Sequence, residues 1–419
     1  MTDIDGFDLI APKAYGERGI PHEQFRALRA RDGLQRFEAE GFEPYYAVVR
    51  HDQIREISTQ PERFINSRGI VLESDAQRQI IERGLATQFR PILMMDPPDH
   101  VDFRKVAAPW FTPRAIERIA PIAEVSARYL VDNLVERAGS GEGECEFSSE
   151  VAAAHPLRVL STILGIPQDR EPQLLRLTNE LFAADDPDLQ REGDDRRQAA
   201  MAMAMEFMQL FNSIIEDRRA HPTDDLASVL ANGQVKGEPM GVIETLGYFL
   251  ITFTAGHDTT KNALASGMYA LAAHPDEYQR LRENPDLVSK AVEEILRWTT
   301  PVNYMKRVVL EDLEYRGQKL CAGDNLVLFY TSANRDEAVF DEPYTFRIDR
   351  DPNPHLGFGI GEHFCLGAHL ARQSQRALLR ELITRFDELE LAGEPAQIQS
   401  SFVVGLKKLP LRYRVKQAA

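Results

Sequence analysis

One cysteine behind a glycine hinge constrains this chain more than any other feature. In the segment from Phe358 to Gly367, FGIGEHFCLG, the glycines at 359 and 361 precede Cys365, and an apolar-periodic, helix-forming run follows. Glycine takes backbone angles that are closed to other residues, so the chain can fold back tightly here. The sulfur would then lie at a helix N-terminus, where unpaired amides and the helix dipole favour the thiolate. We therefore expect a readily deprotonated cysteine in a tight turn.

A thiolate can be a nucleophile, a zinc ligand or a haem ligand, so the rest of the sequence must decide. The other cysteines, Cys145 and Cys321, form no C-x-x-C pair with Cys365, and no H-x-x-x-H spacing supplies the further ligands that zinc needs. The spacing of Gly357, Gly359 and Gly361 also departs from the dinucleotide-binding fingerprint, because the third of these glycines follows the second by two residues and not three. A functional thiolate and a plain buried cysteine both remain open on these residues alone.

The same ten residues resemble the haem-binding loop of the cytochrome P-450 family. The resemblance implies haem b (iron protoporphyrin IX) with the Cys365 thiolate as its axial ligand, a ligand whose electron donation favours cleavage of the O–O bond. By the same matching, Gly359 and Gly367 belong to the cofactor-binding loop. Phe358 would pack over the thiolate and keep water away from it.

Composition limits the other possibilities. The 419 residues are 43% hydrophobic and no linker or repeat divides them, so we expect a single domain over 1–419. The net charge of −16 argues against a nucleic-acid partner. No apolar run approaches the roughly 18 to 20 residues that span a bilayer, and the acidic start resembles neither a signal nor a membrane anchor. With only three cysteines, we expect a cytoplasmic protein, like the soluble bacterial members of the resembled family.

Helical patterns dominate the chain. Apolar periodicity, with prolines and glycines between the segments, predicts helices over 113–136, 195–219, 241–273 and 286–298. Short strands are predicted over 45–49, 325–329 and 409–413. We therefore expect a mainly α protein with small β-sheets. This resembles the single-domain fold of the family, in which the haem lies between an acid–alcohol helix and the cysteine loop with its helix.

An acid and an alcohol stand together inside the apolar pattern of 241–273, in the sequence AGHDTT from Ala255 to Thr260. The hydroxyl of Thr259 can compete for the Ala255 carbonyl, four residues back, which would bend the helix and open a pocket. Gly256 would let a ligand approach the backbone. By resemblance, Ala255 and Gly256 contact the haem, and Asp258 and Thr259 relay protons to bound dioxygen. A surface acid beside a solvated threonine is the alternative, and His257 receives no catalytic role.

A carboxylate and a guanidinium lie three residues apart at Glu294 and Arg297, so they share one helical face. The spacing is not informative by itself, because it recurs at positions 23 and 26, 216 and 219, and 277 and 280, and exposed pairs of this kind contribute little. Their order along the chain, between Thr259 and Cys365, resembles the structural pair of the family. Thr345 stands where a basic partner is expected, which leaves Arg347 and Arg350 as substitutes.

Haem carries two propionates, and a buried dianion needs cations and hydrogen-bond donors. His100 and Arg104 are four residues apart, on one face of a helix that is predicted to begin after Pro97 and Pro98. By resemblance, the propionate partners are His100, Arg104, Arg307 and His363. A surface role is the alternative for each of them.

Substrate contacts are inferred from the variable regions of the family, which correspond here to 70–90, 181–195, 302–305 and 402–406. Their apolar content suggests a hydrophobic substrate such as a terpenoid, a sterol or another lipid-like compound. The helix predicted over 241–273 carries a stripe of apolar side chains, from which Leu250 and Phe253 are added to the predicted pocket. Such stripes most often belong to the hydrophobic core. The predicted pocket residues are Phe182, Leu250, Phe253, Val302, Met305, Phe402 and Val403.

The resemblance implies a haem-thiolate monooxygenase that inserts one oxygen atom from O2 into a hydrophobic small molecule. The sequence contains no flavin or iron–sulfur pattern, so we expect electrons from a ferredoxin and an NAD(P)H-dependent ferredoxin reductase. An acidic partner of this kind could bind a basic patch formed by Arg104, Lys105, Arg114, Arg372 and Arg376. A peroxide-driven peroxygenase is one alternative, although the acid–alcohol pair favours dioxygen. A non-catalytic haem or hydrophobic-ligand binding protein is the other.

Overall fold

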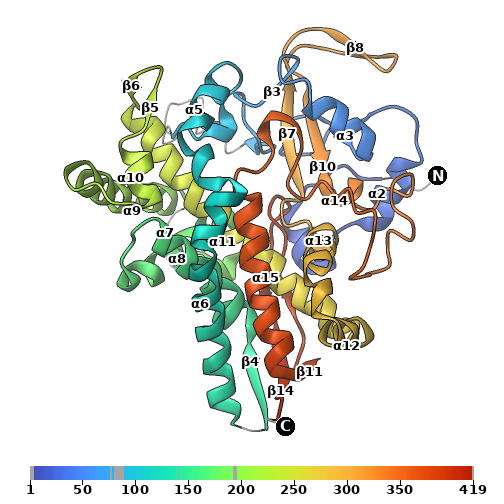
Figure 1. The fold of residues 1–419 in the computed structure, drawn as a ribbon. Coiled ribbons are helices and arrows are strands. Elements are labelled where there is room, and N and C mark those ends of the chain that lie inside the picture. Colours follow the sequence, from blue (N-terminus) through green and yellow to red (C-terminus); the bar gives the residue numbers. More distant parts are fainter. Residues whose placement is uncertain (1–3, 76–77, 80–88, 140, 192–195, 418–419) are drawn as a thin grey trace.

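The computed structural model describes residues 4–75, 78–79, 89–139, 141–191 and 196–417. It is a mainly helical protein with small sheets, as predicted (Figure 1). Helices α11 (Val242–Ala273) and α15 (Ala368–Arg385) border the cysteine loop and its cavity, and α6 (Pro113–Ala138) packs along α15. The other helices are α1 (Pro12–Arg18), α2 (His22–Arg29), α3 (His51–Ser58), α5 (Asp99–Ala107), α7 (Ala154–Ile163), α8 (Glu171–Phe182), α9 (Arg196–Ala220), α10 (Leu226–Ala231), α12 (Pro275–Glu283), α13 (Val288–Thr299) and α14 (Tyr330–Ala333).

The helix boundaries follow from local sequence signals. Thr112 caps α6 by accepting a hydrogen bond from the Ala115 amide, and Pro113 occupies the first turn, where its missing N–H costs nothing. All four predicted helices are present, as α6, α9, α11 and α13. The last begins two residues later than predicted, at Val288, because Pro285–Leu287 forms a short 3-10 turn.

The larger sheet has five strands in the order β1-β2-β10-β7-β3. Two of the predicted strands pair in parallel at its centre, β2 (Tyr45–Val48) and β10 (Asn325–Phe329), in the register Tyr45 to Asn325. The third, β14 (Pro410–Val415), lies between β11 (Phe386–Leu391) and β4 (Glu142–Glu146). The remaining strands are β1 (Gln35–Phe37), β3 (Phe64–Ile65), β5 (Gln234–Val235), β6 (Glu238–Pro239), β7 (Tyr304–Val309), β8 (Leu313–Tyr315), β9 (Gln318–Leu320), β12 (Ala396–Gln397) and β13 (Leu406–Lys408).

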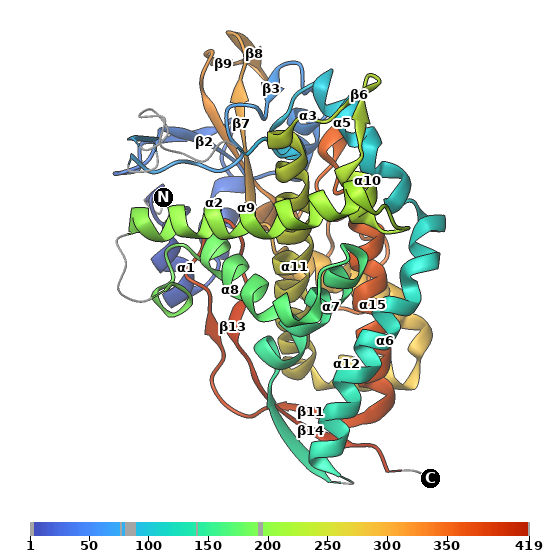
Figure 2. The same ribbon diagram turned by 90° about the vertical axis from the view of Figure 1, so that its left-hand side faces the viewer.

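Helix α11 runs through the body of the molecule and packs against α7, α9 and α13, with α9 crossing it in Figure 2. Helix α15 packs along α6, and the cysteine loop directly precedes it. The largest apolar cluster joins these helices, and two smaller clusters cover the larger sheet. Within the described ranges, no helix has both the length and the apolar character needed to cross a bilayer.

Candidate functional site

The glycines of the cysteine loop have the geometry that their positions predict. Gly359 and Gly361 have φ values of +67° and +78°, in the left-handed region that favours glycine. A Cβ on Gly361 would also lie 2.3 Å from the carbonyl oxygen of Ser58. The turn closes with a hydrogen bond of 3.0 Å from the Cys365 amide to the Phe358 carbonyl. The loop is therefore fixed both internally and against α3.

The cysteine itself differs from the prediction in one respect. Helix α15 begins at Ala368, so Cys365 lies before the helix and not at its first turn. Burial raises the pKa of its thiol, and this outweighs the opposing effects of the Gly367 amide, Arg104 and Arg372. The expectation of a readily deprotonated thiol is therefore wrong for the protein alone. A cation placed beside the sulfur would supply the missing stabilisation of the thiolate.

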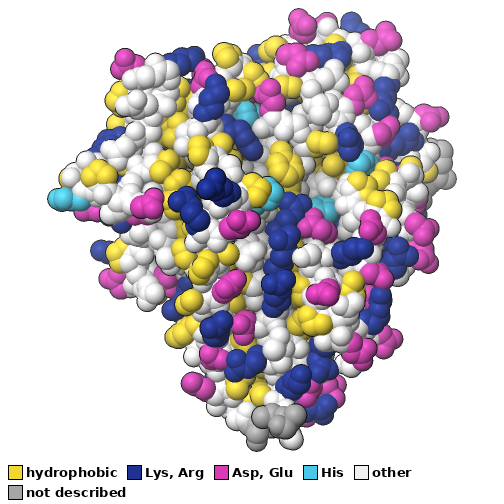
Figure 3. Space-filling view, in the orientation of Figure 1, with side chains coloured by type: hydrophobic (Ala, Val, Ile, Leu, Met, Phe, Trp, Pro, Cys, Tyr) yellow, Lys and Arg dark blue, Asp and Glu magenta, His cyan; other side chains and the backbone are white. Residues whose placement is uncertain are grey.

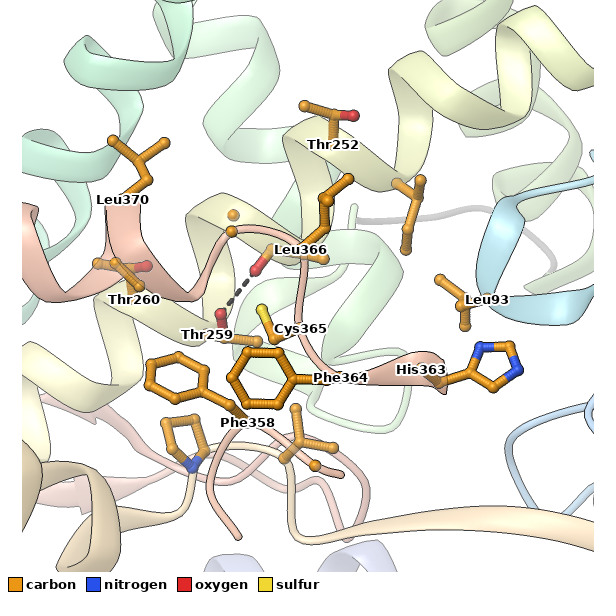
Figure 4. A pocket seen from close by; sticks show the side chains of 18 of the residues that line it. Leu93, Thr252, Thr259, Thr260, Phe358, His363, Phe364, Cys365, Leu366 and Leu370 are labelled. Carbon is orange, nitrogen blue, oxygen red and sulfur yellow. Dashed lines mark hydrogen bonds between the residues drawn. The ribbon is translucent and has the colours of Figure 1, made fainter. Parts of the chain in front are cut away.

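Helix α11 faces the cysteine loop across a cavity (Figure 4). The Thr259 hydroxyl donates a hydrogen bond of 2.6 Å to the Ala255 carbonyl, as its spacing predicts. Ala255, Gly256 and Thr259 all line the cavity, and a Cβ on Gly256 would lie 3.1 Å from the Leu160 side chain on α7. The predicted alcohol and its small neighbours therefore form the wall nearest to the loop.

Asp258 lies on another face of α11 and is not among the residues that line the cavity. Its carboxylate accepts a hydrogen bond of 2.9 Å from Lys261, one turn further along, and Lys261 also donates to Asn179 of α8 at 3.0 Å. Both charged side chains are buried. The structure thus separates the acid from the alcohol, because adjacent residues of a helix point in directions about 100° apart.

The cavity between α11 and the loop encloses about 1600 Å³ of empty space, part of which is open solvent. Its wall includes Phe358, Gly359, Cys365 and Gly367 from the cysteine loop. Figure 4 shows the Phe358 ring close to Cys365, and the Arg372 guanidinium lies 4.4 Å from the centre of that ring. The cavity reaches all the loop residues that the resemblance assigns to the cofactor.

Four nitrogen-bearing side chains from three segments meet at one side of this cavity, and the residues are His100, Arg104, Arg307 and His363. The two imidazole rings are 4.1 Å apart. Neither ring nitrogen of His100 has a hydrogen-bond partner, and the Nε2 atom of His363 has none among the described residues. Arg307 is buried, and among the described residues its side chain donates only to the adjacent Lys306 carbonyl, at 3.0 Å.

Electrostatics in this cluster favour an anion. Burial lowers the pKa of His100 to about 4, and burial with Arg307, His100 and Arg104 lowers that of His363 to about 2. Burial also lowers the pKa of Arg104. Within the described chain the nearest carboxylate contact is Glu362, whose Oε2 lies 3.8 Å from His100 Nδ1. Unpartnered donors and uncompensated positive charge beside a large apolar cavity fit the two propionates of haem.

Glu294 and Arg297 form a fully buried pair with bonds of 2.7 and 2.8 Å between the guanidinium and both carboxylate oxygens. The third partner is Arg350, whose Nε donates to Glu294 at 3.0 Å. Arg347 contributes only its backbone amide, while its side chain pairs with Glu342. The remaining Arg297 donors reach the carbonyls of Asn334 and Pro343. The cluster therefore ties α13 to the segment before the cysteine loop.

The predicted substrate residues divide into two groups. Val302 and Met305 line the cavity. Five others are not part of its lining, namely Phe182, Leu250, Phe253, Phe402 and Val403. Phe253 is fully buried and stacks on His257, on the far face of α11. Parts of the predicted segments 70–90 and 181–195 lie outside the described residues.

Several lining residues were not predicted from the sequence, among them Asn66, Leu93, Ile251, Thr252 and Tyr330, whereas Ile70 belongs to the predicted segment 70–90. Ile251 and Thr252 could have been found by phase, because they lie one and two turns before Ala255, Gly256 and Thr259 on the same helical face. Tyr330 comes from α14 and Asn66 follows β3, so only the tertiary fold brings them to the cavity.

Comparisons with known proteins agree with this geometry. The family model described as Cytochrome P450 matches residues 61–416. Cytochrome P450-terp of a Pseudomonas species is 34% identical and covers 97% of this chain and 96% of its own. Linalool 8-monooxygenase of Pseudomonas putida is 33% identical over 96% of this chain and 97% of its own.

A crystal structure of a cytochrome P450 from Novosphingobium aromaticivorans superposes with a TM-score of 0.89. It is 37% identical, and the match covers 98% of both chains. Members of this family bind haem through a cysteine thiolate, for which the loop and cavity described above are suited. The chain belongs to the cytochrome P450 family and is, like its named relatives, a monooxygenase.

Proposed function

We propose that this chain, acting as one domain over residues 1–419, hydroxylates a neutral hydrophobic small molecule with one oxygen atom from O2. The observation that carries the proposal is a single apolar cavity with Cys365 on one wall and the Thr259 face of α11 on the other. When bound, haem b supplies the activation of dioxygen and the oxidation of the substrate.

The residues of the chain would hold, shield and protonate this centre. Cys365 would bind the iron, and Phe358 would keep water from the sulfur. The propionates would take the vacant hydrogen bonds of the cluster formed by His100, Arg104, Arg307 and His363. Thr259 would hold a proton at its Oγ atom on the cavity wall. Asp258 would exchange protons with Thr259, for which its carboxylate must turn away from Lys261.

The lining supports a neutral substrate. Its charged side chains, Arg104 and Arg307, belong to the cluster proposed for the propionates, and the remaining described lining is predominantly apolar. A charged substrate group would therefore be buried without a partner, which is costly. A terpenoid is consistent with this lining and with the name of the linalool-oxidising relative. Sterols and other lipid-like molecules share the same chemistry.

We also propose that a ferredoxin and its NAD(P)H-dependent reductase supply the electrons. Figure 3 shows Lys and Arg side chains gathered over α15, on the face where the cysteine loop lies. Of the five predicted patch residues, Arg114 is exposed, and Lys105 is exposed beside Asp102. Arg372 is held by Glu293 at 2.7 and 2.8 Å, and Arg104 donates to the Phe364 carbonyl. Lys105 and Arg114 are thus the residues that a partner could contact with least rearrangement.

The test begins with the haem-loaded protein. Reduction under carbon monoxide should give the strongly red-shifted Soret band of thiolate-ligated haem, and Cys365→Ala should lose it. Turnover with ferredoxin, reductase and NAD(P)H is expected to exceed turnover with hydrogen peroxide. A normal Soret position would rule out thiolate ligation, and faster peroxide-driven turnover would identify a peroxygenase.

The partner surface has its own test. Lys105→Glu with Arg114→Glu should slow reduction by ferredoxin and weaken its dependence on salt, because opposite charges steer association. Arg219→Glu, on α9, is a matched control. A rate of reduction in the double variant that equals the wild-type rate and keeps the wild-type dependence on salt would contradict this surface.

A further inference from the structure

Thr252 is a polar residue on the cavity face of α11 that no family motif uses. Along this part of the helix, residues 251, 252, 255, 256 and 259 are partly accessible, while 253, 254, 257 and 258 are buried. This alternation has the period of a helix, so the accessible residues share the face that lines the cavity. The partial exposure of Thr252 is therefore exposure to the cavity.

The hydroxyl of Thr252 is unused, in contrast to the hydroxyls of three other threonines of α11. Thr245, Thr254 and Thr259 each donate to the carbonyl four residues back, at 2.9, 2.7 and 2.6 Å. This is the usual way in which a helical threonine satisfies its hydroxyl away from water. None of the hydrogen bonds between described residues involves the Thr252 hydroxyl, so it is free to bind a ligand.

The surroundings of Thr252 make its hydroxyl selective. The cavity that Thr252 lines has a largely apolar wall, which includes Ile70, Leu93, Ile251, Val302 and Met305. Asn66 is polar, but its Nδ2 atom is already bound to the Leu93 carbonyl at 3.0 Å. In a predominantly apolar cavity, a ligand hydroxyl or carbonyl without a partner costs free energy, so a free hydroxyl on the wall favours the ligand orientation that pairs with it.

We infer that Thr252 is a specificity-determining residue that binds the single hydroxyl or carbonyl group of an otherwise apolar substrate. The inference rests on the proposed function and deepens it. Thr252 and Thr259 are seven residues apart, about 10 Å along the helix axis. A substrate held at Thr252 therefore presents to the Thr259 end of the cavity the carbons farthest from its polar group. Oxidation is directed to the end of the molecule remote from that group.

The experiment uses three ligands with one carbon skeleton: citronellol, citronellal and the hydrocarbon 2,6-dimethyloct-2-ene. Their dissociation constants are measured on the haem-loaded protein by the Soret shift and by calorimetry. The variants are Thr252→Val, which keeps the side-chain shape, and Thr252→Ser, which keeps the hydroxyl. Thr254→Val is the matched control, because its buried hydroxyl is bound to the Leu250 carbonyl.

In Thr252→Val, the preference for the alcohol or the aldehyde over the hydrocarbon should fall by about two- to tenfold, with hydrocarbon binding unchanged. Thr252→Ser should restore the preference, and Thr254→Val should leave it as in the wild type. Products from citronellol should shift from the remote methyl groups to a mixture in Thr252→Val. The alcohol and aldehyde arms tell which polar group is preferred.

An equal preference in wild type and Thr252→Val, with binding and turnover intact, would overturn the inference and leave the proposed function standing. The same holds if Thr254→Val has the larger effect. Failure of all three ligands to shift the Soret band or to be oxidised, in wild type as well, would count against both the inference and the hydrophobic substrate of the proposed function.

Discussion

The cluster around Glu294 and the cluster around His100 both contain buried polar groups, but they differ in whether those groups have hydrogen-bond partners within the described chain. Glu294 meets two guanidinium groups, and the spare donors of Arg297 and Arg350 reach backbone carbonyls. His100, His363 and Arg307 gather nitrogen atoms without a matching anion. Buried charges that are satisfied within the chain serve its fold. Buried donors without a partner destabilise the fold, so their presence indicates a place where a ligand binds.

The largest effect is expected from breaking the cluster around Glu294. Arg297→Ala leaves the Glu294 carboxylate buried with one fewer cation and removes the bonds to Asn334 and Pro343. We expect the free energy of unfolding to fall by about 3 to 5 kcal/mol, both with and without haem. Urea denaturation followed by far-UV circular dichroism measures it. A loss below about 1 kcal/mol would contradict the structural role, because exposed pairs already reach that value.

Arg307→Leu should have opposite effects on the haem-free and the haem-bound protein. Without haem, the substitution removes a buried guanidinium that lacks an anion, so the free energy of unfolding should stay constant or rise. With haem, it removes a charge-assisted hydrogen bond, and haem affinity should fall by about tenfold or more. The haem affinity is measured from the transfer of haem to an excess of a scavenging apoprotein. Equal destabilisation of both states would assign Arg307 to the fold.

The cluster around His100 should also make the haem-free protein sensitive to acid. The pKa of His100 is about 4 in the folded chain, below its ordinary value of 6.5. Between these values the unfolded chain binds the extra proton, so this contribution is complete above pH 6.5 and is lost as the pH falls towards 4. The expected slope is at most about 1.4 kcal/mol per pH unit. The charged and titratable groups facing His100 are Glu362, Asp96, Arg104 and His363.

Denaturation of haem-free wild type and His100→Gln across this range isolates the histidine from other buried imidazoles, such as His155 and His257. With haem bound, the difference in pH dependence between wild type and His100→Gln should be smaller, because a propionate stabilises the imidazolium. Identical slopes in the two proteins would show that the pKa of His100 is the same in the folded and unfolded chains.

The smallest effect is expected from Glu23→Gln. Glu23 and Arg26 have the same spacing as Glu294 and Arg297, but their side chains are 79% and 48% exposed. We expect a change in the free energy of unfolding within about 0.5 kcal/mol, measured beside Glu294→Gln under the same conditions. A comparable loss in both variants would mean that spacing, and not burial, sets the strength of these pairs.

The sequence predicted the parts of the site that depend on local geometry. The glycine positions, the Thr259 bond to Ala255 and the helices around them follow from rules that act over a few residues. The small-sheet architecture also follows, because proline and glycine signals separate the strongly periodic segments.

The features that were not predicted depend on distant partners or on helical phase. The choice of Arg350 over Arg347 depends on how residues 341–350 fold back on α13. Asp258 lies away from the cavity, where its carboxylate accepts a hydrogen bond from Lys261, which also donates to Asn179. Leu250 and Phe253 were expected in the pocket, but the cavity face of α11 passes through Ile251 and Thr252. One residue of phase, about 100° on a helix, separates lining from core.

The close approach of Gly361 to the Ser58 carbonyl has a consequence for biosynthesis. The thiol-bearing turn belongs to the last sixth of the chain, whereas the surface that shapes it belongs to the first. Contacts between such distant segments form late, because the loop that joins them must close first. During translation, the segment against which the cysteine turn packs therefore emerges from the ribosome long before the turn itself, and the turn cannot take its folded shape until both segments have been made.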